Sequence, residues 1–479
     1  MKHWKSVLII AAIISSIILS LTACANVSLP AEQQGTDKKT EEANKIKDLI
    51  PKTIKFAGQK MLIYTDQEEK LLYDSTELGS VKTSIQTRND YLESNYQITL
   101  EVCVVSKEEI SDTLRESLES GLTSAHALCY SAETTSALFT LGYLADIASL
   151  TDFNAEACGI ENFATDPQTA GNHLYMLSTP ALPYYNDLYC VFYRKDSVSK
   201  AGLNYPEQAV LRGEWTVETF RQYAEAIAYT VMHKSSYDAK LDTFGYSSRD
   251  KSTLPVLLAK AAGVGVIGKD KDGYPAIDEN LSSSESICTE LQVLLKSKSR
   301  APYYGSEAVD AFFDGRIGLY IDKISFIDVL YENKMDSESG FDYGILPLPC
   351  GSKGNYVTPT GSDVPVLSVP VNTPIEELSG IGVSVLVGAG RITVRQAAID
   401  SFIALFSSDN EQSCMIDMII GNSASDFGTL YESALQPVFN CASGLYADRF
   451  SKGSSLDSLL KSRKAEFDQC IDSNFRQNS

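Results

Sequence analysis

Strand-like and helix-like segments alternate along the first third of the chain, and this alternation restricts the fold more than any other feature. Short apolar runs typical of buried strands occupy residues 60–64, 98–105 and 127–130. Segments with the pattern of helices separate and follow them, at residues 81–96, 107–122 and 133–141. Strands that alternate with helices predict an α/β fold, with a parallel-type sheet covered by helices on both faces.

The N-terminus has the pattern of an export signal. Lys2 and Lys5 precede an almost wholly apolar run at residues 7–21, which is shorter than the ~20 residues that a membrane-spanning helix needs. The sequence Leu-Thr-Ala-Cys that follows resembles the bacterial lipobox, in which the cysteine, here Cys24, is acylated and becomes the mature N-terminus. We therefore expect a signal peptide at residues 1–23. A secretory signal with a chance cysteine is the alternative.

Residues 24–52 are polar and have no sustained apolar period, which predicts a lipid-anchored flexible tether. The whole chain has 62 acidic and 41 basic side chains, a net charge of −21 at pH 7. Nucleic acids and anionic lipid surfaces both select for clusters of Lys and Arg. We therefore expect no nucleic-acid partner and contact with the membrane through the lipid anchor only.

The ten cysteines are scattered singly along the chain and form no CxxC pair. Their spacing does not match a zinc site, so we expect no metal site and no cofactor. Cys103, Cys129 and Cys190 lie in strand-like runs and are predicted to be small buried hydrophobic side chains. The sequence does not assign disulfides.

An extended, apolar stretch from residue 172 ends in a polar and aromatic cluster at residues 184–187, just before a strand predicted at 188–193. Trp215 then stands at the start of a helix, with Thr216 as its expected N-cap. A chain that leaves one lobe and begins another has this order of features, and ligand sites are common at such boundaries.

Two glycine-containing patterns further along partly resemble nucleotide-binding and calcium-binding loops. The pairs Gly380-x-Gly382 and Gly388-Ala389-Gly390 lack the spacing of nucleotide-binding loops and are expected to be turns, ahead of an apolar helix at 394–406. The segment 270–273, Asp-Lys-Asp-Gly, has too few ligands for a calcium loop and is expected to be a polar hairpin turn.

The assembled features resemble the extracellular solute-binding lipoproteins of bacterial ABC importers, in the branch with maltodextrin- and oligosaccharide-binding proteins (family 1 type). The resemblance spans essentially the whole mature chain. Besides the lipobox, it is carried by short motifs in a typical order: TRNDY at 87–91, GYLAD at 142–146, FYRKD at 192–196, GEWT at 213–216, FDGR at 313–316 and DYGILPLP at 342–349.

The resemblance implies a two-lobed clamshell of the type II periplasmic-binding-protein kind, in which each lobe is a sheet flanked by helices and a hinge joins the lobes. The expected lobe ranges are 53–178 for the first part of lobe 1, 179–366 for the first part of lobe 2, 367–425 for the return to lobe 1, and 426–479 for the C-terminal helices of lobe 2. It also implies a monomer on the extracellular face of the cell membrane. Its partners would be a small solute, preferably a sugar or oligosaccharide, and the subunits of an ABC permease.

Twelve residues are candidates for ligand contacts. Ligands of α/β sheets gather where strands end and helices begin, a position that Tyr130, Glu133 and Thr134 occupy here, although an ordinary helix cap explains them equally well. The resemblance implies Tyr130 and Glu133 again, together with Asp187, Asp322, Ser325, Phe326, Asp426 and Phe427. Chemistry adds Tyr184, Asn186 and Tyr356, because carbohydrate recognition uses flat rings and polar side chains.

Rings for stacking on a sugar come mainly from 25 tyrosines, because Trp215 is the one tryptophan outside the signal region and is expected to pack in the core. A short sugar, an amino acid or a small peptide therefore stays open as the ligand, as does a ligand-sensing role. His126 and His173 are expected to be structural, and no HExxH or GxSxG motif is present. We expect no catalytic residues, and an exported carbohydrate-active enzyme is the weaker alternative.

Overall fold

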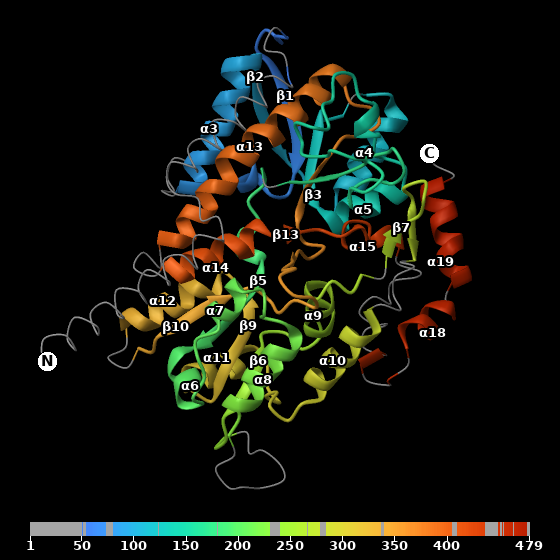
Figure 1. Cartoon of the computed structure of the whole chain (residues 1–479). Helices are drawn as coiled ribbons and strands as arrows, with labels where there is room; N and C mark the ends of the chain where they lie inside the picture. The colour runs from blue at the N-terminus through green and yellow to red at the C-terminus, as the bar shows by residue number, and fades with distance from the viewer. Residues whose placement is uncertain are drawn as a thin grey trace, which may run out of the picture. The chain divides into compact units, whose positions relative to one another are not determined.

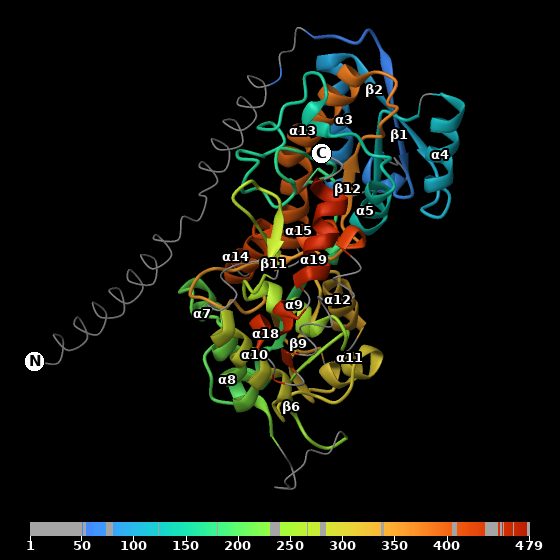
Figure 2. The ribbon, with the colours of Figure 1, turned by 90° about the vertical axis from the view of Figure 1, so that its right-hand side faces the viewer.

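A computed structural model describes the protein from residue 50 onward, with gaps. The described residues are 50, 54–72, 80–122, 124–179, 181–229, 240–265, 267–277, 284–336, 340–404, 410–435, 449–450, 453, 455–462 and 464–476. The predicted signal peptide, Cys24 and nearly all of the tether lie outside this part of the chain. Ile46–Ser479 form one compact unit, which is built on two mixed sheets flanked by helices (Figures 1 and 2).

The first sheet has five strands in the order β2-β1-β3-β12-β4. Strands β1 (Gln59–Thr65), β2 (Ile98–Val104) and β3 (Ala127–Ser131) are parallel, as the alternation of strands and helices predicts. Strand β12 (Pro365–Ser368), for which the sequence predicts no direction, is antiparallel to β3 and to β4 (Leu177–Ser178). The chain reaches β12 through an extended crossing and not through a crossover helix, so nothing imposes the parallel direction.

Both faces of the first sheet are buried at its central strand β3, and the side chains of β3 alternate between them. Ala127 and Cys129 belong to a core shared with residues of α3 (Ser80–Tyr96) and α13 (Glu376–Ala404). Leu128 and Tyr130 belong to the other core, with residues of α5 (Ala132–Thr140). Figure 1 shows α3 and α13 side by side next to β1 and β2. This burial on two faces explains why the strands read as continuous apolar runs.

The two glycine clusters that were expected to be turns lie inside α13, so that prediction is wrong. The helix approaches its neighbours so closely that a Cβ would overlap with other segments. The overlapping atoms are the carbonyl oxygen of Thr151 at Gly380, the thioether of Met61 at Gly382, and Ala181 at Gly390. Glycine is used here for close packing and not for a positive φ, and a single sequence does not separate these two uses.

Among the described helices, α13 is the one that is long and apolar enough to cross a membrane. The mean hydropathy of its most apolar 18-residue window is 1.3, and 78% of that window is buried inside the protein. A buried core helix of a soluble protein has the same length and composition, so these values are weak evidence for a membrane span.

The second sheet has four strands in the order β10-β5-β9-β6. Strand β5 (Tyr189–Arg194) is antiparallel to β9 (Ile317–Lys323) and to β10 (Tyr343–Leu346), and β6 (Phe244–Ser248) is parallel to β9. The helices that pack on these strands are α8 (Val217–Ile227) on β6, α11 (Gly305–Phe313) on β9 and α14 (Asn410–Gly421) on β10.

The remaining described elements connect or flank the sheets. The helices are α4 (Ile110–Ser120), α6 (Lys195–Lys200), α7 (Glu207–Leu211), α9 (Leu254–Ala261), α10 (Glu285–Lys296), α12 (Phe326–Asp336), α15 (Phe427–Leu430), α18 (Leu456–Lys461) and α19 (Lys464–Ile471). The short turns of helix are η1 (Glu68–Lys70), η2 (Ile147–Ser149), η3 (Tyr185–Asp187), η5 (Ser433–Leu435) and η6 (Asp472–Arg476). Two small pairs of strands are β7 (Ile267–Lys269) with β8 (Pro275–Ile277), and β11 (Thr358–Pro359) with β13 (Ser423–Ala424).

The predictions for Trp215 and Thr216 are confirmed. Thr216 Oγ1 accepts a hydrogen bond from the backbone N–H of Thr219 at 3.3 Å, which caps α8. The Trp215 side chain is fully buried, and its indole N–H donates to the carbonyl oxygen of Pro347 at 3.1 Å. Its ring therefore packs in the core of the second sheet and is not available for stacking on a solute.

A buried carboxyl group joins several elements of the second sheet. Glu207 in α7 is 2% exposed, and its Oε1 accepts hydrogen bonds from the Tyr193 hydroxyl and from the side-chain amide of Gln412. Its Oε2 has no partner among the described residues. Burial raises the pKa of Glu207 and outweighs the hydrogen bond from Tyr193, which lowers it.

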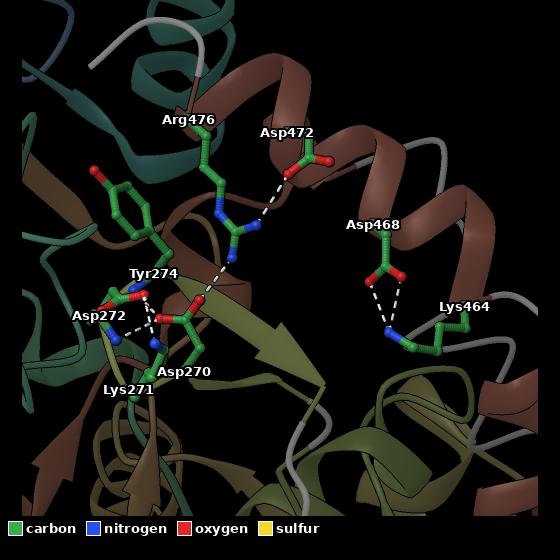
Figure 3. A network of polar contacts seen from close by, with 8 residues as sticks. All are labelled: Asp270, Lys271, Asp272, Tyr274, Lys464, Asp468, Asp472 and Arg476. Atoms are coloured by element: carbon green, nitrogen blue, oxygen red, sulfur yellow. Dashed lines mark hydrogen bonds and ion pairs between the residues drawn. The ribbon is translucent and has the colours of Figure 1, made fainter.

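The hairpin predicted at 270–273 is confirmed, since β7 and β8 pair around it. Asp270 Oδ1 accepts from the backbone N–H groups of Asp272 at 2.9 Å and Tyr274 at 3.0 Å. The other carboxylate oxygen accepts from Arg476 of η6 at 2.6 Å, and the same guanidinium lies over the Tyr274 ring (Figure 3). Arg476 also donates to Asp472 at 3.1 Å, so the C-terminal segment is tied to the hairpin.

Two of the three cysteines predicted to be buried are so, namely Cys129 and Cys190. Cys103 is exposed, and the prediction for it is wrong because β2 is an edge strand of the first sheet and its last residues are covered on neither face. The cysteines in the described part of the chain are free thiols. The predicted lobe ranges stay a prediction.

Candidate functional site

A cavity of about 690 Å³ is lined by segments that are far apart in the sequence. One group of lining residues comes from α9, the loop 263–265 and β7. A second group comes from residues 357–362 around β11 and residues 424–432 around β13 and α15. Tyr189 at the start of β5 and Pro167 complete the wall.

The lining segments are connected to both sheets, and β11 itself contacts α9 and β5. Helix α9 packs on α10, which packs on α8 of the second sheet. Helix α15 packs on α5, which packs on strands β3 and β12 of the first sheet. A solute in this cavity therefore contacts elements that pack with each of the two sheets.

A chain of hydroxyl groups connects the second group of segments to β4 of the first sheet. The Ser425 hydroxyl lies 2.7 Å from the Thr360 hydroxyl and 3.0 Å from the Ser178 hydroxyl. The Tyr184 hydroxyl lies 3.1 Å from that of Ser423 in the same region. Each of these hydroxyl groups can donate or accept a hydrogen bond, so those that line the cavity can bind either a donor or an acceptor of the solute.

An ion pair lies on the wall of the cavity. The Lys260 ammonium of α9 is 2.8 Å from Asp426 Oδ2, and it also donates to the Thr429 hydroxyl. Asp426 caps α15, because its Oδ1 accepts from the backbone N–H of Thr429 at 3.0 Å. Burial alone would raise the pKa of Asp426, but the charge of Lys260 and the hydrogen bonds from Lys260 and Thr429 outweigh burial and lower it. The lowered pKa favours the ionised form of Asp426 at the wall.

A second, much smaller cavity of about 10 Å³ shares Thr360 and Gly361 with the first and is lined by Tyr184, Asp187 and Asp363. Lys323 at the end of β9 lies 2.7 Å from Asp187 Oδ1 and 3.6 Å from Asp363 Oδ2. Burial lowers the pKa of Lys323, but the hydrogen bond and charge of Asp187, together with the charge of Asp363, raise it overall.

The twelve predicted site residues fall into different environments. Asp426 lines the larger cavity, while Tyr184 and Asp187 line the smaller one. Four aromatic rings are buried and line neither cavity, namely those of Tyr130, Phe326, Tyr356 and Phe427. Tyr130 donates its hydroxyl to the carbonyl oxygen of Val105 at 2.9 Å, and Tyr356 donates its hydroxyl to that of Val210 at 3.1 Å. Such hydrogen bonds satisfy buried polar groups and hold the core together.

The remaining five predicted residues also lie outside both cavities. Asp322 is fully buried in β9 and accepts from Arg249 at 3.3 Å, and burial raises its pKa. The carbonyl oxygen of Asn186 accepts from the backbone N–H of Ser325. Glu133 is exposed in the first turn of α5, where the backbone N–H of Thr134 donates to the Ser131 hydroxyl at 3.2 Å. This last hydrogen bond is an ordinary helix cap, the expected alternative to a ligand contact at this position.

Most residues of the larger cavity were not predicted, including Lys260, Thr360, Ser425 and Thr429. One usable local signal is the Gly- and Ser-rich loop around residues 351–362. Elsewhere the lining residues belong to helices and turns whose neighbours in space are more than a hundred residues away, so local patterns do not indicate them.

Among the described residues, no group of three or more His, Cys, Asp or Glu side chains lies where it could hold a metal ion. His173 Nδ1 lies 2.8 Å from Asp146 Oδ2, and His126 Nδ1 accepts from the backbone N–H of Leu62 at 3.1 Å. Neither histidine lines a cavity described above. The site is thus defined by hydroxyl groups, one ion pair and apolar side chains.

Comparison with known proteins finds no matching family model and no matching curated protein. Solved structures do match over most of the chain. The cyclic alpha-maltosyl-1,6-maltose binding protein from Arthrobacter globiformis has a TM-score of 0.53 at 13% identity, covering 87% of this chain and 97% of that chain. A sugar transporter protein from Rhizobium etli, in an open conformation, has a TM-score of 0.53 at 15% identity, covering 87% and 98%.

The sugar-binding protein MalE from Xanthomonas citri has a TM-score of 0.52 at 14% identity, covering 88% of this chain and 98% of that chain. At such identities the likeness concerns the fold. It agrees with the two mixed sheets flanked by helices. The predicted fold class is confirmed: the chain has an α/β fold of the type II periplasmic-binding-protein kind.

Proposed function

We propose that this protein is a lipid-anchored, extracellular solute-binding protein that captures a sugar or oligosaccharide and delivers it to the permease of an ABC transporter. The solute would bind in the 690 Å³ cavity and contact the elements of both sheets. Cys24 would carry the lipid, and the polar segment up to residue 52 would connect the lipid to the folded unit.

The observation that carries the proposal is the cavity itself. Its volume lies within the roughly 300–1,000 Å³ typical of small-molecule sites. Its wall offers hydroxyl groups from Thr360 and Ser425, the charged groups of Lys260 and Asp426, and the ring of Tyr189. These are the groups that hydrogen-bond to sugar hydroxyls and that contact the apolar face of a pyranose.

The solved structures with the same fold support the choice of solute and role. Their names describe a cyclic maltosyl-maltose binding protein, a sugar transporter protein and a sugar-binding protein. We carry sugar binding and transport over to this chain as part of the proposal. We also propose that the protein releases its solute unchanged and is not an enzyme.

The proposal is tested by the thermal stability of the full chain, held in phospholipid nanodiscs, against a panel of mono- and oligosaccharides, amino acids and short peptides. A solute at 100 times its dissociation constant should add ~2.7 kcal/mol to the free energy of unfolding. A saturable shift with one class of sugar, without new products by chromatography, is the expected result. Product formation would favour an enzyme, a shift with amino acids or peptides alone would replace the solute class, and no shift with any compound would overturn the proposal.

A further inference from the structure

The exposed wall of the larger cavity is mostly apolar. The aliphatic side chains that line it come from α9, the following loop, β7 and the β11 segment: Val256, Leu257, Val264, Ile267, Val357 and Pro359. Among the described lining residues, the ring of Tyr189 is the one aromatic ring. An unsubstituted oligosaccharide presents a continuous edge of hydroxyl groups, and the aliphatic part of this wall offers those groups no hydrogen-bond partners.

Several of the polar groups on the same wall already have partners. Lys260 is engaged by Asp426 and Thr429, and Ser425 by Thr360. A solute gains little by exchanging one hydrogen bond for another, whereas it gains from each apolar group that it removes from water. The polar groups are therefore suited to one hydrophilic end of a solute, and the aliphatic side chains to an apolar part.

We propose that the preferred solute is a glycoside that carries an apolar substituent, such as an alkyl or acyl chain, and not an unsubstituted oligosaccharide. The inference rests on the proposed function, because it takes the cavity to be a sugar site. The sugar contacts the hydroxyl groups around Ser425 and Thr360 and the Lys260–Asp426 pair. The substituent packs against the aliphatic side chains of α9, β7 and Val357.

The size of the effect follows from the number of carbon atoms buried. Burying one methylene group is worth roughly fourfold in a dissociation constant. A butyl glycoside has three more methylene groups than its methyl counterpart, so complete burial of the chain would tighten binding roughly 60-fold. Even half of that burial gives roughly eightfold.

The test is isothermal titration of the full chain in phospholipid nanodiscs with matched pairs of methyl and butyl glycosides of glucose, galactose and maltose. Empty nanodiscs correct for partition of the butyl chain into lipid. For the sugar that binds, we expect the butyl glycoside to bind at least about fivefold more tightly than the methyl glycoside. Equal affinities would overturn the inference and leave the proposed function standing. Absence of saturable binding with every sugar in both forms would overturn both.

A pair of variants shows whether the preference arises at this wall. Val256 and Val357 are half-buried and line the cavity, so the double substitution Val256→Thr, Val357→Thr keeps their shape and makes the wall more polar. The butyl preference should fall at least about threefold, while the affinity for the methyl glycoside changes less than about twofold. Val329→Thr on α12, an exposed position outside the cavity, is the matched control and should change neither. A butyl preference that the double variant leaves intact would overturn the inference.

Discussion

Substitution of Gly390 by alanine tests the close packing of α13 against its neighbours. In an exposed helix interior, this change stabilises a protein by up to ~1 kcal/mol, because alanine has the higher helix propensity. At Gly390 an added Cβ would overlap Ala181 and would lie 3.2 Å from Cδ of Arg88. Forcing an extra carbon into a packed site costs typically ~1–3 kcal/mol.

Displacement of Ala181 would have a second cost. The buried guanidinium of Arg88 donates to the carbonyl oxygen of Ala181 at 2.6 Å and to that of Leu71 at 2.8 Å. A hydrogen bond from a charged group contributes ~1.5–3 kcal/mol, and part of this is lost if Ala181 moves. Combining these effects, we expect Gly390→Ala to lower the free energy of unfolding by about 2 kcal/mol or more.

The assay is urea unfolding of the full chain followed by far-UV circular dichroism. Gly421→Ala is the matched control, because Gly421 ends helix α14 and an added Cβ there would meet only the side chain of Arg395, at 3.4 Å. It should leave stability unchanged or raise it by less than ~1 kcal/mol. A Gly390→Ala variant as stable as the wild type would refute the reasoning, because the gain in helix propensity would then outweigh the cost of the overlap with Ala181.

Three further predictions concern a buried carboxyl group, the smaller cavity and the anchor. The raised pKa of Glu207 means that the folded state holds its proton more tightly than the unfolded state, in which a glutamate titrates near ~4.3. The contribution of the protonated Glu207 carboxyl to the free energy of unfolding is therefore complete below pH ~4.3 and is lost as the pH rises through the folded pKa of Glu207. Glu207→Gln removes this titration, so thermal stability should fall less between pH 4 and pH 7 than it does in the wild type. An unchanged pH profile would contradict this. Asp187→Ala should change the solute affinity by less than about twofold in a protein that stays folded by circular dichroism, because Asp187 lines only the smaller cavity. A loss of ~1.5 kcal/mol or more, the contribution of a hydrogen bond to a charged group, would extend the solute site to that cavity. Cys24→Ser should move the protein from the membrane fraction to the soluble fraction, and its persistence in the membrane fraction would disprove the lipid anchor.

The fold was predictable because its signals are local. The strands β1, β2 and β3 and the helices α3 and α5 appear in the sequence as apolar runs and helical periods, and a capped helix start marks Trp215. The glycines of α13 were misread because their role depends on Met61, Thr151 and Ala181, which are distant in the sequence. The direction of β12 could not be predicted for a related reason, since strand direction depends on where the chain crosses and not on the composition of the strand.

The candidate site was less predictable than the fold. The predicted aromatic residues lie next to turns, where a ligand could meet them, but Tyr130, Phe326 and Tyr356 have their rings in the core. Sequence patterns identify a ring and its strand, but not the face of the sheet that the ring occupies when both faces are buried. Lys260 and Asp426, which meet at the cavity wall, are separated by more than 160 residues, and nothing in either local sequence indicates the other.

The account depends most on the claim that the 690 Å³ cavity is the solute site, and blocking the cavity tests it most directly. Gly265 lines the cavity, and a Cβ added there meets no atom within 4 Å, so Gly265→Trp introduces a bulky ring at the wall without displacing the backbone. Val329→Trp places the same side chain at an exposed position of α12 as the control. The measurement is isothermal titration of both variants and the wild type with the tightest-binding sugar. We predict one solute per chain for the wild type and for Val329→Trp, and no detectable binding for Gly265→Trp. Wild-type affinity in a folded Gly265→Trp variant would contradict the account and place the solute elsewhere.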